Sequence, residues 1–228
     1  SMGSAIYATT GTQQAGIARI DGVPQAGIWS GTAASFINMN PAGATYSVAR
    51  ATTGTQQAGY ADIGGAQLAG IWSGTAASWV SLHPAGSMGS EVFATNGTHQ
   101  VGYAFMNFVQ SAVIWSGTAG SLEVLPMPQT GSWPISTAYG IWSDGTTLYV
   151  AGFGLNTSIN RGMALLWTRP IAPPCIADFD QDGGVTGADI EAFFIDFEQG
   201  LDSADVNQDG GTTGDDVAFF FTHFEQGC

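Results

Sequence analysis

Oxygen-bearing side chains recur at alternate positions in two short segments near the C-terminal end of the sequence. In both segments they occupy positions 1, 3, 5, 9 and 12 of twelve residues, and a glycine at position 7 offers its carbonyl. The first segment provides Asp178, Asp180, Asp182, Gly184, Thr186 and Asp189, and the second, 27 residues later, provides Asp205, Asn207, Asp209, Gly211, Thr213 and Asp216. A hard divalent cation prefers about six to eight oxygen ligands. The spacing therefore predicts one bound cation in each segment.

A second glycine, at position 6, makes the pattern that of an EF-hand calcium loop. Gly183 and Gly210 permit the sharp turn that brings alternate side chains inward. Position 12 is Asp rather than the longer Glu, so coordination through both of its oxygens requires closer approach of the backbone. We expect two calcium ions, with Thr186 and Thr213 acting through water.

Each loop is followed by apolar residues at helical spacing, which predicts two helices that pack on each other. The stripes are Ile190, Phe193, Phe194 and Phe197, and Val217, Phe220, Phe221 and Phe224. Gly200 and Gly227 follow Glu-Gln pairs and are expected C-terminal caps. Because Pro173 and Pro174 precede the first loop, no helix is expected before it. The unit is loop then helix, twice.

The segment from Cys175 to Cys228 resembles a type I dockerin, the duplicated calcium module that docks enzymes onto cohesin scaffolds. It is most similar to dockerin-like tails of large secreted planctomycete proteins, which end in Gly-Cys. The resemblance implies calcium at the twelve loop residues above, an extracellular or cell-surface location, and a cohesin-like or cell-surface protein partner. Many cohesin-binding dockerins carry a hydroxyl pair at loop positions 10 and 11. This chain has Gly187-Ala188 and Gly214-Asp215 there, so the cohesin does not follow from the resemblance.

The two cysteines of the chain bracket this module. Cys175 and Cys228 at its two ends predict a disulfide clasp and an oxidising compartment, with two unrelated thiols as the alternative.

The net charge of −14 belongs almost entirely to the C-terminal module. Residues 1–170 hold five acidic side chains against four arginines, whereas the other thirteen acidic residues follow without any Lys or Arg. No basic patch favours a nucleic acid partner. No apolar run reaches the length of a membrane span.

Before Pro170 the sequence repeats every 43 residues. Trp29, Trp72 and Trp115 each precede Ser-Gly-Thr-Ala, and a degenerate fourth copy contains Trp167. We interpret the four tryptophans as one strand position, used for packing between repeats. In the second copy, turn signals separate four runs that favour strands: Tyr46–Thr52, Gln57–Asp62, Gln67–Trp72 and Ser78–Leu82.

Four strands per repeat is the size of one β-propeller blade. The predicted fold class is therefore mainly β, with β-propeller-like repeats of four-stranded blades, about 3.75 of them, and a small α-helical, calcium-binding, dockerin-like domain. The predicted domains are 1–169 for the repeats, 170–174 for a Pro-rich linker and 175–228 for the module. Unclosed edges, and the recurrence of Ser1-Met2-Gly3-Ser4 as Ser87-Met88-Gly89-Ser90, suggest a fragment of a longer protein, with a self-associating half-propeller as the alternative.

No catalytic residue is predicted. Asp21 and Asp144 precede glycines and indicate turns, and neither a nucleophile elbow nor a phosphate-binding loop occurs. The leading hypothesis is a secreted, non-enzymatic propeller that binds or displays a carbohydrate or protein ligand, attached through the calcium module. The alternative is a fragment of an extracellular polysaccharide-degrading enzyme whose catalytic part lies upstream. A purely structural surface protein is a third possibility.

Overall fold

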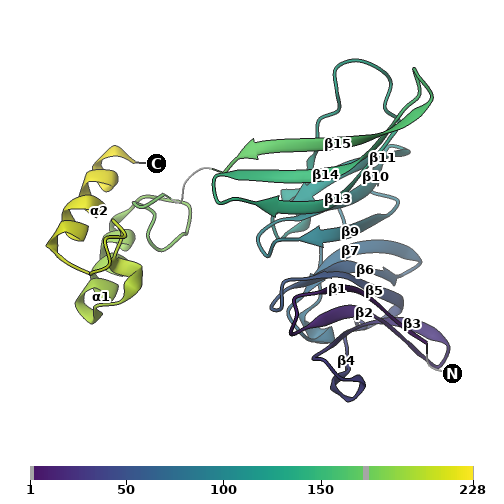
Figure 1. The fold of residues 1–228 in the computed structure, drawn as a ribbon, viewed down its shortest axis with the longest axis horizontal. Helices are drawn as coiled ribbons and strands as arrows, with labels where there is room; N and C mark the ends of the chain where they lie inside the picture. The colour runs from purple at the N-terminus through teal and green to yellow at the C-terminus, as the bar shows by residue number, and fades with distance from the viewer. Residues whose placement is uncertain (1–2, 172–174, 228) are drawn as a thin grey trace. The chain divides into compact units, whose positions relative to one another are not determined.

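The computed structural model describes residues 3–171 and 175–227 of the chain. It forms two compact units, residues 1–170 and 171–228, shown in Figure 1. All described β-strands lie in the first unit and both described α-helices lie in the second, so the protein is mainly β with two C-terminal helices, as predicted.

The first three repeats each fold as a four-stranded antiparallel meander. The strands are β1 (Ser4–Thr9), β2 (Gln14–Ile20), β3 (Val23–Trp29) and β4 (Ile37–Asn38); β5 (Ala44–Thr52), β6 (Gln57–Ile63), β7 (Ala66–Trp72) and β8 (Val80–Ser81); and β9 (Ser90–Thr95), β10 (Gln100–Met106), β11 (Val109–Trp115) and β12 (Glu123–Val124). Neighbouring strands therefore follow the order of the sequence, as four strands per repeat predict.

A turn of 3₁₀ helix precedes the fourth strand of each of the first three repeats, so in the second repeat that strand, β8, is shorter than the predicted Ser78–Leu82. These turns are η1 (Ala33–Ser35), η2 (Ala76–Ser78) and η3 (Ala119–Ser121). In η2 the Ser78 hydroxyl accepts from the Ser73 N–H at 2.8 Å and donates to the Thr75 carbonyl at 2.7 Å. Ser78 thus closes the turn instead of starting the strand.

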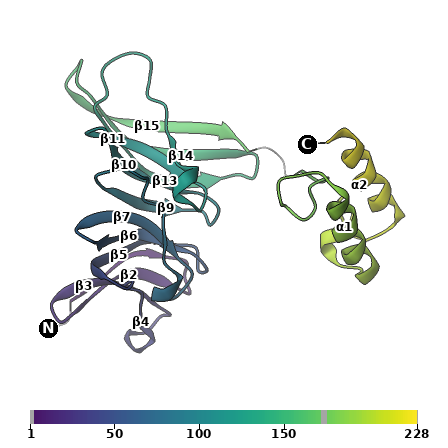
Figure 2. The ribbon, with the colours of Figure 1, turned by 180° about the vertical axis from the view of Figure 1, so that it is seen from behind.

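The fourth repeat supplies three strands: β13 (Ile135–Ser143), β14 (Thr147–Asn156) and β15 (Arg161–Pro170). A parallel pairing of Gln110 with Ile135 joins them to the third repeat, so the two repeats share one seven-stranded sheet. The repeats stack in succession, with β15 at one edge (Figures 1 and 2). The described strands do not close into a barrel or propeller.

Pro170, the expected first linker residue, is the last residue of β15. Residues 172–174 of the expected linker lie outside the described residues.

Tryptophans fill the first two contacts between repeats, which confirms the packing role predicted for them. The Trp72 indole packs with Ala15, Ile28 and Met39 of the first repeat. One repeat later, Trp115 packs with Ala58, Ile71 and Leu82. Both indoles are completely buried.

The register confirms that the four tryptophans share one strand position. Trp29, Trp72, Trp115 and Trp167 lie opposite Gln14, Gln57, Gln100 and Val150. In every repeat this partner stands two residues before the glycine beside a register shift, Gly16, Gly59, Gly102 or Gly152. Trp167 differs in its surroundings, because it is only partly buried and its Nε1 donates to the Pro126 carbonyl at 2.6 Å.

The recurring glycine of the Gln-Ala-Gly motif is explained by a close approach between strands. A β-carbon on Gly59 would overlap the Val48 carbonyl oxygen, and one on Gly102 would overlap the Glu91 carbonyl oxygen. Both contacts lie beside register shifts in the β5–β6 and β9–β10 pairings. Only glycine fits at these positions.

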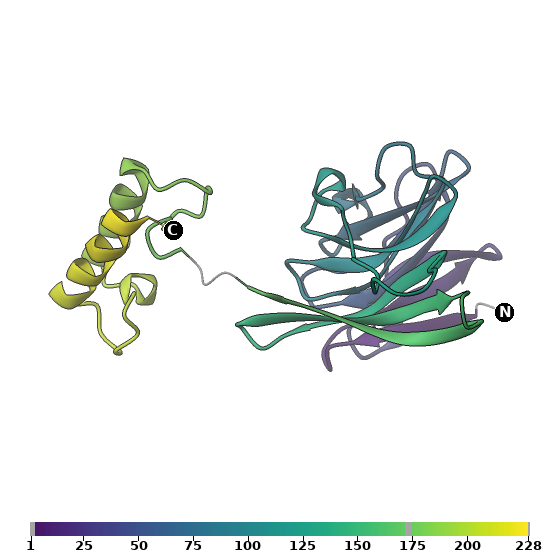
Figure 3. The ribbon, with the colours of Figure 1, turned by 90° about the horizontal axis from the view of Figure 1, so that it is seen from above.

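The second unit contains α1 (Gly187–Gln199), a short 3₁₀ turn η4 (Asp202–Ala204) and α2 (Gly214–Gln226). The helices lie side by side (Figure 3). Phe193 and Phe220, both completely buried, stack with their rings parallel and their centroids 4.3 Å apart. This confirms the predicted aromatic core between the two helices. Neither described α-helix is long and apolar enough to cross a membrane.

The two expected helix caps differ from each other. Gly200 adopts the left-handed conformation and its N–H bonds to carbonyls in the last turn of α1, as predicted. Gly227 also has a positive φ of 69°, but its ψ of −171° is not helical. Both glycines therefore stand at the predicted C-caps, and only Gly200 has the left-handed helical geometry.

Candidate metal centres

The first loop gathers three carboxylates. Oxygen atoms of Asp178, Asp180 and Asp182 lie within 4.8 Å of one another. Gly183, with φ of 93°, makes the turn that the sequence predicts and donates its N–H to Asp178 at 3.1 Å. The N–H groups of Asp182 and Gly184 bond to Asp180 and Asp182 at 3.0 and 2.8 Å. Backbone donors therefore fix the orientation of each carboxylate.

One oxygen of this loop has no partner among the described residues. Asp178 Oδ1 is buried and accepts no hydrogen bond. A buried carboxylate oxygen without a donor costs free energy, because it has lost its water without a replacement. A cation beside Asp180 and Asp182 would satisfy it. The residues present thus fit a metal ion.

The second loop repeats the arrangement with one substitution. Oxygen atoms of Asp205, Asp209 and Asp216 lie within 4.8 Å of one another. Asn207 replaces the position-3 aspartate; its Nδ2 donates to Asp209 at 3.1 Å and its Oδ1 accepts the Asp209 N–H at 2.9 Å. Gly210 has φ of 95° and donates to Asp205 at 2.9 Å. Two equivalent groups that could hold a metal ion are therefore present.

The position-12 aspartates connect each loop to its helix. Asp189 and Asp216 are completely buried. Asp189 accepts the N–H of Asp180 at 3.2 Å and that of Thr186 at 2.7 Å. The N–H of Thr186, with those of Asp180 and Phe179, lowers the pKa of Asp189 below its usual value although burial opposes this. Asp216 makes the equivalent bonds to Asn207 and Thr213 at 3.2 and 2.8 Å.

The position-9 threonines act as helix N-caps. Thr186 accepts the Ala188 N–H at 3.1 Å, and Thr213 accepts the Asp215 N–H at 3.2 Å. Each forms a reciprocal capping box with the aspartate three residues on. Their water-mediated role, and the carbonyl ligands expected from Gly184 and Gly211, stay predictions.

Crowding of like charges has a direct electrostatic effect at Asp180. The Asp182 N–H lowers the pKa of Asp180, but burial and the neighbouring carboxylates Asp182, Asp189 and Asp178 outweigh it, so the pKa is raised. A bound cation would reverse the balance by favouring the charged form. The carboxylates of the first loop are therefore chemically suited to hold a positive ion.

Sequence reasoning missed one backbone feature of the loops. Gln181 and Gln208, both at position 4, have φ of 60° and 58°. Glutamine carries no signal for the left-handed region.

The predicted disulfide joins Cys175 to Cys228. Because Cys228 lies outside the described residues, the disulfide stays a prediction.

A second site candidate lies on the first two strands of successive repeats. The Arg50 guanidinium carbon lies 4.9 Å from the ring centre of Tyr7, 5.9 Å from Tyr60 and 5.7 Å from Phe93. Its Nε bonds to Glu91 at 2.7 Å. Burial raises the pKa of Glu91 above its usual value, although the Arg50 guanidinium opposes this.

The aromatic rings continue into the third and fourth repeats. Phe93 lies 6.1 Å from Tyr103 and 5.0 Å from Tyr139 between ring centroids. Tyr7 and Tyr139, at the two ends, are about half exposed. We call the rings of Tyr7, Tyr60, Phe93, Tyr103 and Tyr139 the aromatic row. No local motif marks it, because only the stacking of repeats brings these residues together.

Comparison with known protein families gives no match to this chain. Comparison with curated proteins gives no relative.

Proposed function

We propose that this protein is a secreted, non-enzymatic binding protein held to its partner by a calcium-loaded, dockerin-like C-terminal module. In this proposal the repeats act as an open, propeller-like stack of blades that carries the ligand. The observation that carries the proposal is the pair of equivalent loops, in each of which oxygen atoms of three carboxylates lie within 4.8 Å of one another. The unsatisfied Asp178 Oδ1 in the first loop supports it.

Calcium is the cation that the donor set favours. Every expected ligand is an oxygen from a carboxylate, an amide, a backbone carbonyl or a water, and neither Cys nor His contributes. Oxygen ligands suit hard cations, whereas zinc and copper prefer nitrogen or sulfur. A twelve-residue loop with alternate ligands can enclose the larger calcium ion, while Mg²⁺ demands a tighter octahedral arrangement and retains water.

The residues that would hold each ion also fold the module. Asp189 and Asp216 close the loops, cap the helices and are buried beside the aromatic core. A cation offsets the repulsion among the carboxylates and thereby stabilises the two helices that present a docking face. Metal binding and folding are thus coupled. The partner we propose is a cohesin-like or cell-surface protein.

The aromatic row supports the proposal of a ligand surface on the repeats. Tyrosine offers an apolar ring face and a polar hydroxyl together. Gln67 donates to Glu91 at 3.0 Å and to the Tyr103 hydroxyl at 3.2 Å, which places hydrogen-bonding groups beside the rings. A carbohydrate chain, with apolar C–H faces and peripheral hydroxyls, has the complementary chemistry.

Calorimetric titration of the calcium-free full chain tests the metal assignment. We expect two calcium ions per chain, and one ion for Asp178→Asn, because this change removes a carboxylate ligand from the first loop and leaves every ligand of the second loop in place. Glu191→Gln, on α1 outside both loops, is the matched control and should still bind two. Failure to bind calcium, or equal binding of Mg²⁺, contradicts the proposal.

A further inference from the structure

The two ends of the repeat stack expose side chains whose counterparts are buried at the contacts inside it. At the first internal contact, Ala49 and Trp72 of the second repeat pack on Ala15, Ala26 and Ile28 of the first. The three residues of the first repeat are at most 4% exposed. We call such a set, which lies against the repeat that follows, a receiving face. The set that packs on it from the next repeat is an inserting face.

The fourth repeat presents a receiving face that no described residue covers. Leu166 and Ala164 stand one and three residues before Trp167, and Ala151 lies opposite Leu166, as their counterparts do in the first repeat. All three apolar side chains are exposed. Leu166 is 67% exposed, against 4% for its counterpart Ile28. An exposed apolar set of this kind marks an interaction surface.

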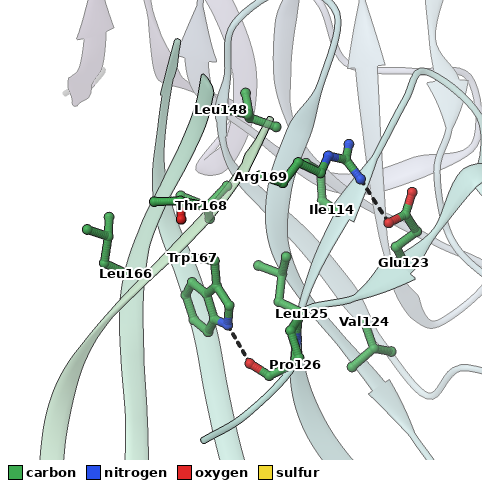
Figure 4. A pocket seen from close by; sticks show the side chains of 11 residues that line it. Ile114, Glu123, Val124, Leu125, Pro126, Leu148, Leu166, Trp167, Thr168 and Arg169 are labelled. Atoms are coloured by element: carbon green, nitrogen blue, oxygen red, sulfur yellow. Dashed lines mark hydrogen bonds and ion pairs between the residues drawn. The ribbon is translucent and has the colours of Figure 1, made fainter. Parts of the chain in front are cut away.

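The other side of β15 is already occupied by the third repeat. Figure 4 shows the Trp167 indole directed at Pro126 and the Arg169 guanidinium directed at Glu123. The indole Nε1 donates to the Pro126 carbonyl at 2.6 Å, and Nη1 of the guanidinium lies 2.9 Å from Oε2 of the carboxylate. Leu166 lies on the other side of the strand, because successive side chains point to opposite faces (Figure 4). Only the outer side of β15 is therefore open.

The backbone of β15 also lacks two bonds that the third strands of the other repeats make. In each of those repeats, the alanine three residues before the tryptophan accepts an N–H from just after the fourth strand, at 2.8–2.9 Å. Its own N–H donates to a serine hydroxyl on the first strand of the next repeat. These bonds join Ala26 to Ser47, Ala69 to Ser90 and Ala112 to Ser136, at 2.9, 3.0 and 2.9 Å. Within the described chain Ala164 has neither bond, and unpaired groups on an edge strand favour pairing with another chain.

The first repeat presents the matching inserting face. Ser4 and Ile6 of β1 correspond by the 43-residue repeat to Ser47 and Ala49. The Ser4 hydroxyl has no hydrogen-bond partner among the residues that the structure describes. Ile6 is 49% exposed, whereas Ala49 is completely buried. Neither face has the polar surface that caps a stack of repeats.

We propose that the receiving face of the fourth repeat binds the inserting face of the first repeat in a second copy of this chain. In this contact the Ala164 N–H donates to Ser4 of the second copy, and Ile6 of that copy packs on Ala151 and Leu166. A second copy is the occupant that fits, because the chain itself carries both halves of the contact. Each added copy offers the same free face again, so the contact is head-to-tail and builds a ring or an open filament.

Light scattering of the full chain at increasing concentration tests the proposal. We expect the molar mass to rise above that of one chain as the concentration increases. Leu166→Glu places a charge on the receiving face and Ile6→Glu places one on the inserting face, so each variant alone should be a monomer. Phe108→Glu is the matched control, because Phe108 is an 84% exposed apolar residue in a turn of the third repeat. It should associate as the native chain does.

Mixing the two variants separates head-to-tail assembly from other association. Leu166→Glu keeps an intact inserting face and Ile6→Glu keeps an intact receiving face, so their mixture should form a dimer and nothing larger. Ser4→Ala removes no bond within the described chain and should weaken association of the native chain several-fold. A native chain that stays monomeric, a mixture of folded variants that stays monomeric, or unchanged association of Ser4→Ala would overturn the proposal. Native-like association of Ile6→Glu would do so too, because it indicates symmetric pairing of two β15 edges.

Discussion

Replacement of Trp115 by alanine tests whether the repeats are held together by their buried indoles. A buried tryptophan removes roughly 150–250 Å² from water, and at about 25 cal/mol per Å² this corresponds to about 4–6 kcal/mol. Trp115 is completely buried, and large-to-alanine changes in cores cost about 3–5 kcal/mol. We expect Trp115→Ala to lower the free energy of unfolding by about 4 kcal/mol, a large part of the roughly 5–15 kcal/mol typical of a domain.

Trp142 provides the matched control in the same unit. It is 61% exposed on β13 and contacts Tyr149 with ring centroids 5.4 Å apart. Its replacement by alanine should cost at most about 1 kcal/mol.

Urea unfolding followed by tryptophan fluorescence measures both changes. All seven tryptophans lie in residues 1–170, so the signal reports the repeats and not the helical unit. If Trp115→Ala costs no more than Trp142→Ala, the repeats are not held together by the packing of these buried indoles.

Three further changes test separate parts of the structure. Gly59→Ala should destabilise by about 1–3 kcal/mol through overlap with a strand carbonyl, whereas Gly120→Ala, which restores the alanine of the other repeats, should be neutral in the same unfolding assay. Burial lowers the pKa of His83 and His99 below 6.5, so their neutral forms stabilise the fold above that pH and this contribution is lost as the pH falls through it. The fluorescence-detected melting temperature should therefore drop on acidification below about pH 6.5, and less so in His99→Gln; an equal drop contradicts the reasoning. Hydrogen bonds, chiefly from the Thr186 N–H, lower the pKa of Asp189 from 3.8, so the stabilisation is present above that pH and lost below it; helix content measured by circular dichroism should fall there and not between pH 7 and 5.

Local signals explain why the loops and helices could be predicted from the sequence. A glycine at position 6 and an aspartate at position 12 act over a few residues, and each appears in the structure at its expected place, as φ of 93° at Gly183 and as the buried Asp189 show. The four-strand repeats follow from the same kind of evidence, because turn residues separate short alternating runs.

Features that depend on the register of distant strands could not be predicted. The aromatic row requires residues of four repeats to come together: Tyr7 and Phe93 both contact Arg50, and Phe93 contacts Tyr139.

The buried position-12 aspartates explain how a residue shorter than glutamate can serve both loops. Asp189 accepts N–H groups from Asp180 in the loop and from Thr186 at the helix start, so the backbone is drawn in around the carboxylate. The same bonds set the first turn of α1, and Phe193 of that helix stacks on Phe220 of α2. A ligand that pulls on the loop therefore also acts on the helix and on the core. Because the second loop repeats these bonds through Asp216, the two metal groups are coupled through one aromatic core, and binding of the first ion should favour binding of the second.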